Sequence, residues 1–262
     1  MLKITSINVN GIRSAFKKNF NNWLATNNSD VICLQEIRIS NNEITNTLLN
    51  PIPFYGHFYS AEKRGYSGVG IYTKKEPNKI TNGLGVKEFD SEARIMRADW
   101  DSFSIINAYF PSGSSGEHRQ LAKMRFLNEF ELYIQDIIHD FQRNKKHFFI
   151  CGDLNIAHDK IDIKNWKNNI NKPGFLPEER NWLTKILKEY KLVDVFRKIN
   201  PTLEEYTWWS NRANSRERNI GWRIDYQITT TETANLAKTH SIYRIDKFSD
   251  HAPLTIDYDI NV

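Results

Sequence analysis

The chain has 262 residues, of which 40% are hydrophobic and 13% aromatic, and its formal net charge is +5. This length and apolar content suit one large α/β domain, 1–262, and the basic balance favours an anionic partner, with nucleic acid as the first candidate. No apolar run approaches the roughly 20 residues that a membrane helix needs, and no signal peptide is apparent, so we expect a soluble cytoplasmic protein. Cys33 and Cys151 lie inside apolar runs, which favours buried free thiols.

Short apolar runs predict many strands interleaved with a few helices. Strands are predicted over 2–9, 30–34, 54–59, 69–73, 93–100, 103–109, 147–151, 224–229 and 254–258. Helices are predicted around Phe16 to Leu24, through the apolar positions from Leu127 to Phe141, and from Pro177 onward. The polar stretch 159–174 is predicted to be a long surface loop. With no long linker, this pattern predicts one α/β sandwich with two mixed sheets.

Four acidic segments lie far apart in the sequence, and each closes a hydrophobic run. They place Glu36, Asp153, Asp225 and Asp250 where a buried strand meets a loop. No thiolate cluster or His-x-x-x-His spacing accompanies them, so the oxygen-rich set favours Mg²⁺, with Mn²⁺ as a possible substitute, over zinc. A site that attacks phosphate esters requires such carboxylates to position a water and neutralise charge.

Two pairs of polar residues have a spacing of two at predicted strand ends. Asn8 and Asn10 form one pair, and Asp153 and Asn155 form the other, so each pair projects to one side of its strand. Such a pair can hold a metal, a water or a phosphate oxygen. Because Asx residues also favour turns after strands, either pair alone is better explained by turn formation.

Asp225 lies within a run that is otherwise typical of a buried strand, so its carboxylate needs a partner. Arg223 is one candidate. A histidine is the other, with the carboxylate fixing the tautomer of the imidazole. His251, in Ser249-Asp250-His251-Ala-Pro, is the candidate histidine, although a lone histidine at such a place is more often structural.

The segment 206–223 carries four Arg and three Trp with a single acid. Arg binds phosphates and Trp stacks on bases, whereas the alternative is a core tryptophan pair beside a solvated basic loop. Trp208 and Trp209 are adjacent, so only one can face the core of a strand. Tyr109, at the end of a strand, could donate to a phosphate, but alone it is better explained as a strand-end aromatic. Other basic pairs are interpreted as solvated surface: Lys17-Lys18, Lys63-Arg64, Lys74-Lys75 and Lys145-Lys146.

In this order, the motifs resemble the exonuclease III family of abasic-site endonucleases, in the endonuclease/exonuclease/phosphatase superfamily. The matching segments are 8–13, 34–36, 64–69, 109–113, 152–157, 175–180, 206–209, 222–226 and 249–253. They span nearly the whole chain, and the ordered set is very specific. The chain shows no N-terminal extension, so it resembles a compact bacterial member.

The resemblance implies a four-layer, DNase I-like α/β sandwich with two mixed sheets face to face and helices outside. It implies Mg²⁺-dependent cleavage of duplex DNA 5′ to abasic sites in base excision repair, leaving a 3′-hydroxyl. It also implies 3′-phosphatase, 3′-phosphodiesterase and 3′–5′ exonuclease activity on blocked 3′ ends, by an enzyme that acts as a monomer.

The resemblance also assigns roles to residues. It implies metal ligands among Asn8, Glu36, Asp153, Asn155, Asp250 and His251. It implies catalytic roles for Tyr109, Asp153, Asn155, Asp225 and His251, with either Asp153 or His251 as the base. It implies DNA contacts from Arg13, Tyr66, Trp208, Arg212, Trp222 and Arg223, and from the turn 65–68. Asn10 departs from the pattern, since some members have Asp there.

Three alternatives stay open. One is another enzyme of the superfamily, such as an inositol-phosphate phosphatase, a sphingomyelinase or an RNA deadenylase. The second is a paralogue that processes only 3′ ends, because its pocket excludes an internal abasic sugar. The third is a non-catalytic DNA-binding protein on the same fold, which we would expect to have lost some of the acids.

Overall fold

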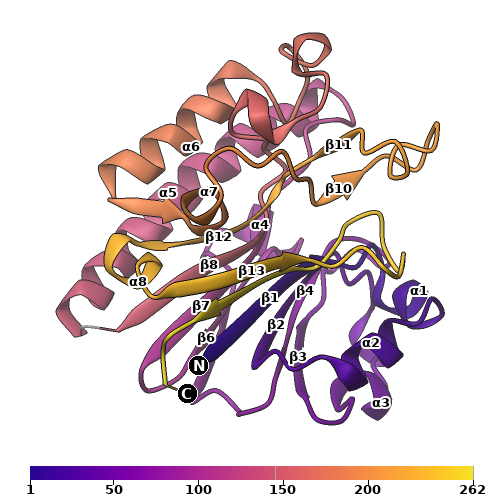
Figure 1. Cartoon of the computed structure of the whole chain (residues 1–262). Helices are drawn as coiled ribbons and strands as arrows, with labels where there is room; N and C mark the ends of the chain where they lie inside the picture. Colours follow the sequence, from indigo (N-terminus) through magenta and orange to yellow (C-terminus); the bar gives the residue numbers. More distant parts are fainter. Residues whose placement is uncertain (145, 262) are drawn as a thin grey trace.

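Two six-stranded sheets form the centre of the molecule (Figure 1). The structure, a computed structural model, describes residues 1–144 and 146–261, so Lys145 of the predicted surface pair lies outside the described residues. The first sheet has the order β13-β14-β1-β2-β4-β3. Its strands are β1 (Leu2–Asn8), β2 (Val31–Gln35), β3 (Tyr55–Tyr59), β4 (Val69–Thr73), β13 (Ala237–Ile242) and β14 (Leu254–Tyr258).

The second sheet has the order β5-β6-β7-β8-β12-β9, and β10 and β11 form a separate two-stranded ribbon. Its strands are β5 (Lys79–Asn82), β6 (Ile95–Asp99), β7 (Phe103–Tyr109), β8 (His147–Asp153), β9 (Leu192–Asp194) and β12 (Asp225–Thr230). The ribbon consists of β10 (Trp208–Trp209) and β11 (Gly221–Trp222). Both sheets are mixed, because β1 pairs with β2 and β7 with β8 in parallel while the other pairings are antiparallel.

Helices cover the outer face of each sheet. The α-helices are α1 (Ile12–Phe16), α2 (Phe20–Thr26), α3 (Asn46–Leu49), α4 (Lys87–Asp90), α5 (Glu117–Asn144), α6 (Pro177–Glu189), α7 (Val195–Ile199) and α8 (Thr231–Ala234). Three 3₁₀ turns are η1 (Asn41–Glu43), η2 (Lys160–Asp162) and η3 (Trp166–Asn168). In Figure 1, α5 and α6 lie against the second sheet and α1 to α3 lie beside the first. Among the described residues, none of these helices has the length and apolar content to cross a membrane.

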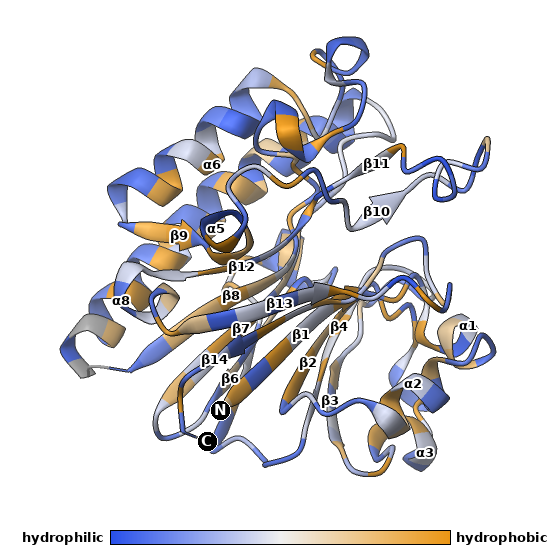
Figure 2. Ribbon diagram, in the orientation of Figure 1, coloured by the Kyte–Doolittle hydropathy of each residue, from blue (hydrophilic) through white to orange (hydrophobic). Residues whose placement is uncertain are grey.

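Three apolar clusters follow this layering. One fills the space between the sheets and includes both buried, free cysteines, Cys33 and Cys151, as predicted. A second packs α5 and α6 on the second sheet, and a third packs α1 and α2 on the first. Figure 2 shows the apolar colour along the strands and on the sheet-facing sides of the helices, with hydrophilic turns outward. Burial of these faces is the main term that stabilises the sandwich.

Buried amides join the two sheets directly below the strand ends that carry the predicted site. Nε2 of Gln35 donates to Oδ1 of Asn107 at 2.7 Å, and Nδ2 of Asn107 donates to the carbonyls of Leu34 and Gly70. The amide of Asn107 therefore bonds to backbone atoms of the opposite sheet. Because buried polar groups need their partners, these contacts fix how the sheets are aligned at this end.

The predicted strands are all present, with half of their ends shifted by one or two residues. Four short strands, β5, β9, β10 and β11, and the edge strand β13 were not predicted. The helix predicted around Phe16 to Leu24 is two helices, separated at Asn19, which has a positive φ of 68°. The segment 159–174 is a loop that contains the turns η2 and η3, and α6 begins at Pro177 as predicted.

Candidate active site

The ends of four strands bring the predicted polar residues to one end of the sandwich. Asn8 pairs with Gln35 at the end of β1 and β2, so Glu36 follows directly beside Asn8. In the second sheet Tyr109 and Asp225 both pair with Asp153, from the two neighbouring strands. Parallel strands that end together, with an antiparallel strand that begins there, therefore place these side chains at one edge.

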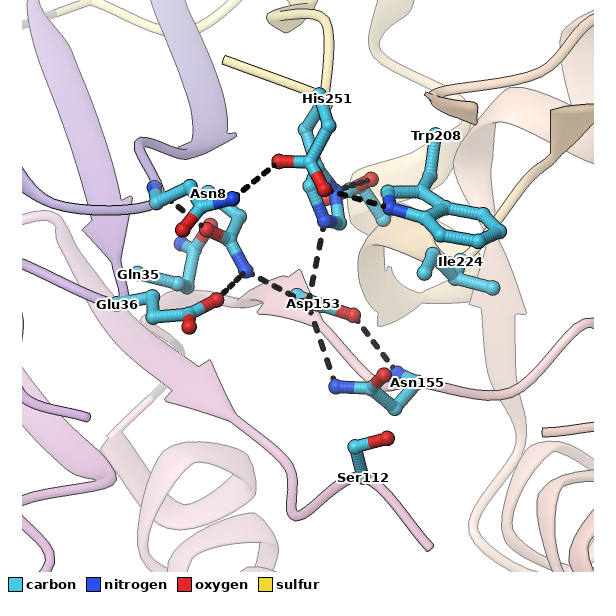
Figure 3. Close-up of polar contacts among 12 residues, drawn as sticks. Asn8, Gln35, Glu36, Ser112, Asp153, Asn155, Trp208, Ile224 and His251 are labelled. Carbon is cyan, nitrogen blue, oxygen red and sulfur yellow. Dashed lines mark hydrogen bonds and ion pairs between the residues drawn. The ribbon is translucent and has the colours of Figure 1, made fainter. Parts of the chain in front are cut away.

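Asn8 connects the two sheets at the site (Figure 3). Its Nδ2 donates to Oε2 of Glu36 at 2.9 Å and to Oδ2 of Asp153 at 3.0 Å. Glu36 also accepts from the guanidinium of Arg38. Glu36, Arg38 and Asn155 have positive φ angles of 57°, 49° and 51°, so the chain turns sharply after each strand. Such conformations at non-glycine residues are uncommon and concentrate at functional sites.

His251 lies between two buried carboxylates. Its Nδ1 is 2.9 Å from Oδ2 of Asp225, and its Nε2 is 3.8 Å from Oδ2 of Asp153. Burial alone would lower the pKa of His251, but Asp225 outweighs it and raises this pKa to about 10. The imidazolium form is thus favoured at neutral pH. The histidine is the partner of Asp225, and Arg223 is not.

Asp153 is the carboxylate most strongly affected by its surroundings. Burial raises its pKa to about 7, against the opposing effect of His251. Its Oδ1 accepts from the backbone N–H of Asn155 at 2.8 Å, and Oδ2 lies 3.3 Å from Nδ2 of Asn155. A carboxylate with a pKa near neutrality can both accept and release a proton at physiological pH.

Asp250 remains ionised beside this group. Burial would raise its pKa, but His251 and the hydrogen bonds from Asn10 and Trp208 lower it. Nδ2 of Asn10 donates to Oδ1 at 2.8 Å, and Nε1 of Trp208 donates to Oδ2 at 3.0 Å. The side chain of Asn10 is therefore bonded to Asp250.

Tyr109 is nearly buried, with 9% of its surface exposed. Burial raises the pKa of its phenol well above the usual value, and Glu36 adds to this effect. The guanidinium of Arg94 lies 4.9 Å from the centre of the Tyr109 ring and counteracts it. A protonated phenol at this place is a hydrogen-bond donor.

Most of these residues line one cavity of about 540 Å³. Its lining includes Asn8, Asn10, Glu36, Arg38, Tyr109, Ser112, Ser114, Asp153, Asn155, Asp250 and His251 on one side, and Gly174, Trp208, Trp222 and Ile224 on the other. The rings of Trp208 and Trp222 meet edge to face, with centroids 6.0 Å apart. An anionic group can thus lie on the polar side while a flat apolar group contacts the tryptophans.

Gly174 limits the width of the apolar side. Its φ is +90°, and a Cβ there would lie 2.9 Å from the Trp222 ring and 3.1 Å from the carbonyl oxygen of Asn155. Any side chain would therefore push into the wall of the cavity. The sequence interpretation missed this glycine, as well as Arg38 and Ile224, because only the folded chain brings them to the cavity.

The two tryptophans of the Trp208-Trp209 pair divide as expected. Trp209 is buried, with Nε1 bonded to Asn219, while Trp208 is half-buried at the cavity. Arg13 is exposed and lies at a larger hollow of about 1210 Å³ beside the site, which Lys17, Lys18 and Lys247 also line. Lys17 and Lys18 are thus exposed, as predicted, but they also line this basic hollow. Arg212 is exposed on the loop between β10 and β11.

Arg13 is paired with Glu43, and two further predicted DNA contacts, Tyr66 and Arg223, are half-buried or buried among protein partners. The hydroxyl of Tyr66 accepts from Arg94 and Arg119 and is itself half-buried. For Arg223 the prediction is wrong. Its side chain is fully buried, with Nε bonded to Asp162 at 2.8 Å and a terminal nitrogen bonded to Asp194 at 2.7 Å. A guanidinium enclosed by two carboxylates cannot reach a phosphate on the surface.

The donor set fits a hard divalent cation. Glu36 and Asp153 share the Asn8 amide, so two carboxylates and an amide stand together without a thiolate. Asp153, Asp225 and His251 also form a close group, with candidate ligand atoms within 4.8 Å of one another. The hydrogen bond of Nδ1 to Asp225 and the raised pKa of His251 make this group better suited to hold a proton than a metal.

Comparison with known proteins places this geometry in a family. The model of the Endonuclease/Exonuclease/phosphatase family matches residues 5–251. The chain belongs to this family. An exodeoxyribonuclease of Bacillus subtilis is 36% identical over 261 residues, which cover 99% of this chain and 100% of the relative. The DNA repair nuclease APEX1 of Danio rerio is 36% identical over 259 residues, which cover 97% and 81%.

Solved structures agree with the family assignment. An AP endonuclease from Archaeoglobus fulgidus superimposes with a TM-score of 0.90 at 31% identity, covering 99% of this chain and 100% of that chain. The 3′–5′ exonuclease NExo of Neisseria meningitidis has the same TM-score at 25% identity, covering 99% and 100%. The predicted family and the four-layer sandwich are therefore confirmed.

Proposed function

We propose that this chain is a Mg²⁺-dependent DNA repair nuclease that hydrolyses the phosphodiester 5′ to an abasic site in duplex DNA. The series Asp225–His251–Asp153 carries the proposal: Asp225 is hydrogen-bonded to His251, Asp153 lies 3.8 Å from the other ring nitrogen, and His251 and Asp153 line one cavity with Trp208 and Trp222. The polar side suits a phosphate, and the wall suits a deoxyribose without its base. The names of the relatives, which include AP endonucleases and an exodeoxyribonuclease, support the same reaction.

Glu36 would hold the cation, with Asn8 beside it and Asp250 in the lining of the same cavity. When bound, Mg²⁺ supplies positive charge that offsets the charge on the phosphoryl oxygens. Mn²⁺, with the same preference for oxygen, is the expected substitute. These residues are carboxylates and amides, which suit either ion.

Asp153 is the base in this proposal. It accepts a proton from water while the oxygen of that water forms a bond to phosphorus and the bond from phosphorus to O3′ breaks. His251, as imidazolium, and the Nδ2 hydrogen of Asn155 that is not bonded to the Phe110 carbonyl donate to the phosphoryl oxygens, where negative charge develops. The hydroxyl of Tyr109 donates a proton toward the departing O3′, which leaves as a 3′-hydroxyl. Asp225 keeps the imidazolium charged and oriented.

The same chemistry acts on a blocked 3′ end, so we also propose 3′-phosphatase, 3′-phosphodiesterase and 3′–5′ exonuclease activity. A restriction to 3′ ends is less well supported, because relatives that are 31% and 35% identical are named AP endonucleases, whereas the 3′–5′ exonuclease NExo is 25% identical. A non-catalytic role is also less well supported, since Glu36, Asp153, Asp250 and His251 all line one cavity. We further propose that the enzyme acts as a monomer in the cytoplasm, which sedimentation velocity and cell fractionation test directly.

A nicking assay tests the proposal. A labelled duplex with one tetrahydrofuran abasic analogue is incubated with Mg²⁺, with Mn²⁺ and with EDTA. A second duplex carries a nick with a 3′-phosphate, and RNA and an inositol phosphate serve as rival substrates. We expect a metal-dependent cut 5′ to the analogue. Removal of the 3′-phosphate without this cut would assign the chain to 3′-end processing, and hydrolysis of a rival substrate alone would overturn the proposal.

A further inference from the structure

A buried ion pair lies behind the active-site cavity. Nζ of Lys123, on α5, is 2.6 Å from Oε1 of Glu179, on the first turn of α6, and both side chains are completely buried. Isolated buried charges cost a great deal of free energy, and apolar side chains often stabilise such a place equally well. The pair therefore calls for an explanation beyond packing.

Glu179 fixes the segment that enters α6. Its Oε2 accepts from the backbone N–H of Gly174 at 2.7 Å and of Leu176 at 3.0 Å. Its Oε1 accepts from Nε2 of Gln120 at 3.2 Å, in addition to Lys123. The carboxylate is thus surrounded by four donors, and one of them belongs to the glycine of the cavity wall.

Lys123 reaches the active site through the backbone. Its Nζ donates to the carbonyl oxygen of Asn155 at 2.8 Å. Asn155 has a left-handed backbone with φ 51°, and its side chain donates to the carbonyl of Phe110 at 3.0 Å. The carbonyl oxygen that Lys123 contacts is also one that a Cβ on Gly174 would meet at 3.1 Å. The ammonium group of Lys123 therefore fixes the position of the Asn155 backbone between the cavity and α5.

The charge of Lys123 also extends to the catalytic carboxylate. Burial lowers the pKa of Lys123, whereas Glu179 and, to a smaller degree, Asp153 raise it.

We propose that Lys123 is a positioning residue that fixes Asn155 for phosphate hydrolysis, with Glu179 as the buried counter-ion that holds Lys123 in place. The inference rests on the proposed function of the same cavity, because it concerns how Lys123 supports Asn155, a residue that acts there. A shift of about 1 Å in a group that contacts the transition state costs up to roughly 10²-fold in rate, so support of this kind is measurable.

The test separates positioning from stability with three variants. Lys123→Met removes the charge and the bond to Asn155. The double variant Lys123→Met with Glu179→Gln restores neutrality, and its amide oxygen can still accept from Gly174 and Leu176. Its NH₂ can donate to Oε1 of Gln120 once the Gln120 amide, whose Nε2 now faces Glu179, rotates by half a turn; this Oε1 is buried without a partner among the described residues. Lys123→Arg keeps both the charge and the donors.

A matched control lies on the same two helices. Nζ of Lys185, on α6, is 2.5 Å from Oε1 of Glu131, on α5, and about half of the Lys185 side chain is exposed. Lys185→Met therefore breaks a Lys–Glu bridge between α5 and α6 without touching the cavity. Thermal unfolding, kcat and KM on the abasic duplex and on the 3′-phosphate, and the NMR signal of the Asn155 side-chain amide are measured for each variant.

We expect the double variant to recover most of the melting temperature that Lys123→Met loses. Its kcat should stay about tenfold or more below wild type on both substrates, with KM within about twofold, and the Asn155 signal should shift. Lys123→Arg should recover part of kcat, and Lys185→Met should leave kcat and the signal unchanged. Wild-type kcat and an unshifted Asn155 signal in the double variant would overturn the inference. Absence of nicking by the wild type would overturn the proposed function alone, because the Asn155 signal is read without substrate.

Discussion

Nδ1 of His251 lies 2.9 Å from Oδ2 of Asp225, a buried contact between a loop and the first residue of β12. The other oxygen, Oδ1 of Asp225, has no hydrogen-bond partner among the described residues. Among the described residues, the Asp225 side chain is therefore hydrogen-bonded only to His251, and this carboxylate raises the pKa of His251 to about 10. The charge on the imidazole is a property of this pair, since burial alone would remove it.

Asp225→Asn is predicted to neutralise the imidazole and lower turnover on the abasic duplex by roughly 10²-fold or more. An amide has almost the same shape, but it no longer favours the charged form of His251. The pKa of His251, followed by NMR in metal-free protein, should fall substantially. A variant whose His251 titrates as in wild type would show that Asp225 does not control this charge.

Asp153→Asn is predicted to lower turnover by about 10²-fold or more while binding of abasic duplex survives. The amide can keep one oxygen for the N–H of Asn155 but cannot take a proton from water. Single-turnover rates and a fluorescence anisotropy titration separate the two effects. Turnover like that of wild type would remove Asp153 from the mechanism.

Glu36 and Asp153 could be predicted because each lies at or just after the end of an apolar strand, and strands that end together bring their last residues to one edge. Asn8 ends β1 in the same way, whereas Asp225 is the first residue of β12, which begins at this edge. The choice of His251 as the partner of Asp225 could not be made from the sequence, since Arg223 is only two positions from Asp225. The actual partners of Arg223 are Asp162, in the predicted loop, and Asp194, in β9, which was not predicted.

The residues that were missed depend on contacts between distant segments. Lys123 is one of many charged residues on an amphipathic helix, and its sequence position gives no sign that it is buried. Gly174 follows a proline in a polar loop, where glycine usually marks a turn. The contacts of Lys123 and Gly174 form only when α5, α6 and the segment 153–157 pack together. This packing joins distant segments, so no local sequence pattern indicates it.

Trp208→Ala is predicted to weaken discrimination for abasic over intact duplex, by roughly tenfold, more than it weakens affinity for intact duplex. Trp208 supplies apolar surface in the cavity and also donates from Nε1 to Asp250. Trp208→Phe, which keeps an aromatic ring but loses this donor, is the matched variant and should retain most of the discrimination. Equal losses on both duplexes in anisotropy titrations would make Trp208 part of the scaffold.

Glu36→Gln is predicted to raise the Mg²⁺ concentration for half-maximal nicking by about tenfold or more, since it removes a full negative charge from the cation site. Glu88→Gln, on α4 and paired with Arg125 away from the cavity, is the control and should not change the Mg²⁺ dependence. The measurement is an initial-rate titration with Mg²⁺ at fixed ionic strength. If both variants need the same Mg²⁺ concentration as wild type, Glu36 does not hold the metal.

Asp162 is predicted to make folding stability depend on acid pH. Burial would raise its pKa, but Arg223 and Arg197 outweigh burial and lower it to about 2, below the ordinary value of an aspartate. The folded pKa lies below the unfolded one, so this contribution, about 2 kcal/mol, is present above pH 4 and is lost as pH falls toward 2. Urea unfolding of wild type and Asp162→Asn should therefore differ more at pH 6 than at pH 3. The exposed Asp101→Asn is the control, and a gap for Asp162→Asn that is equal at both pH values would contradict the role of the Arg223 ion pair.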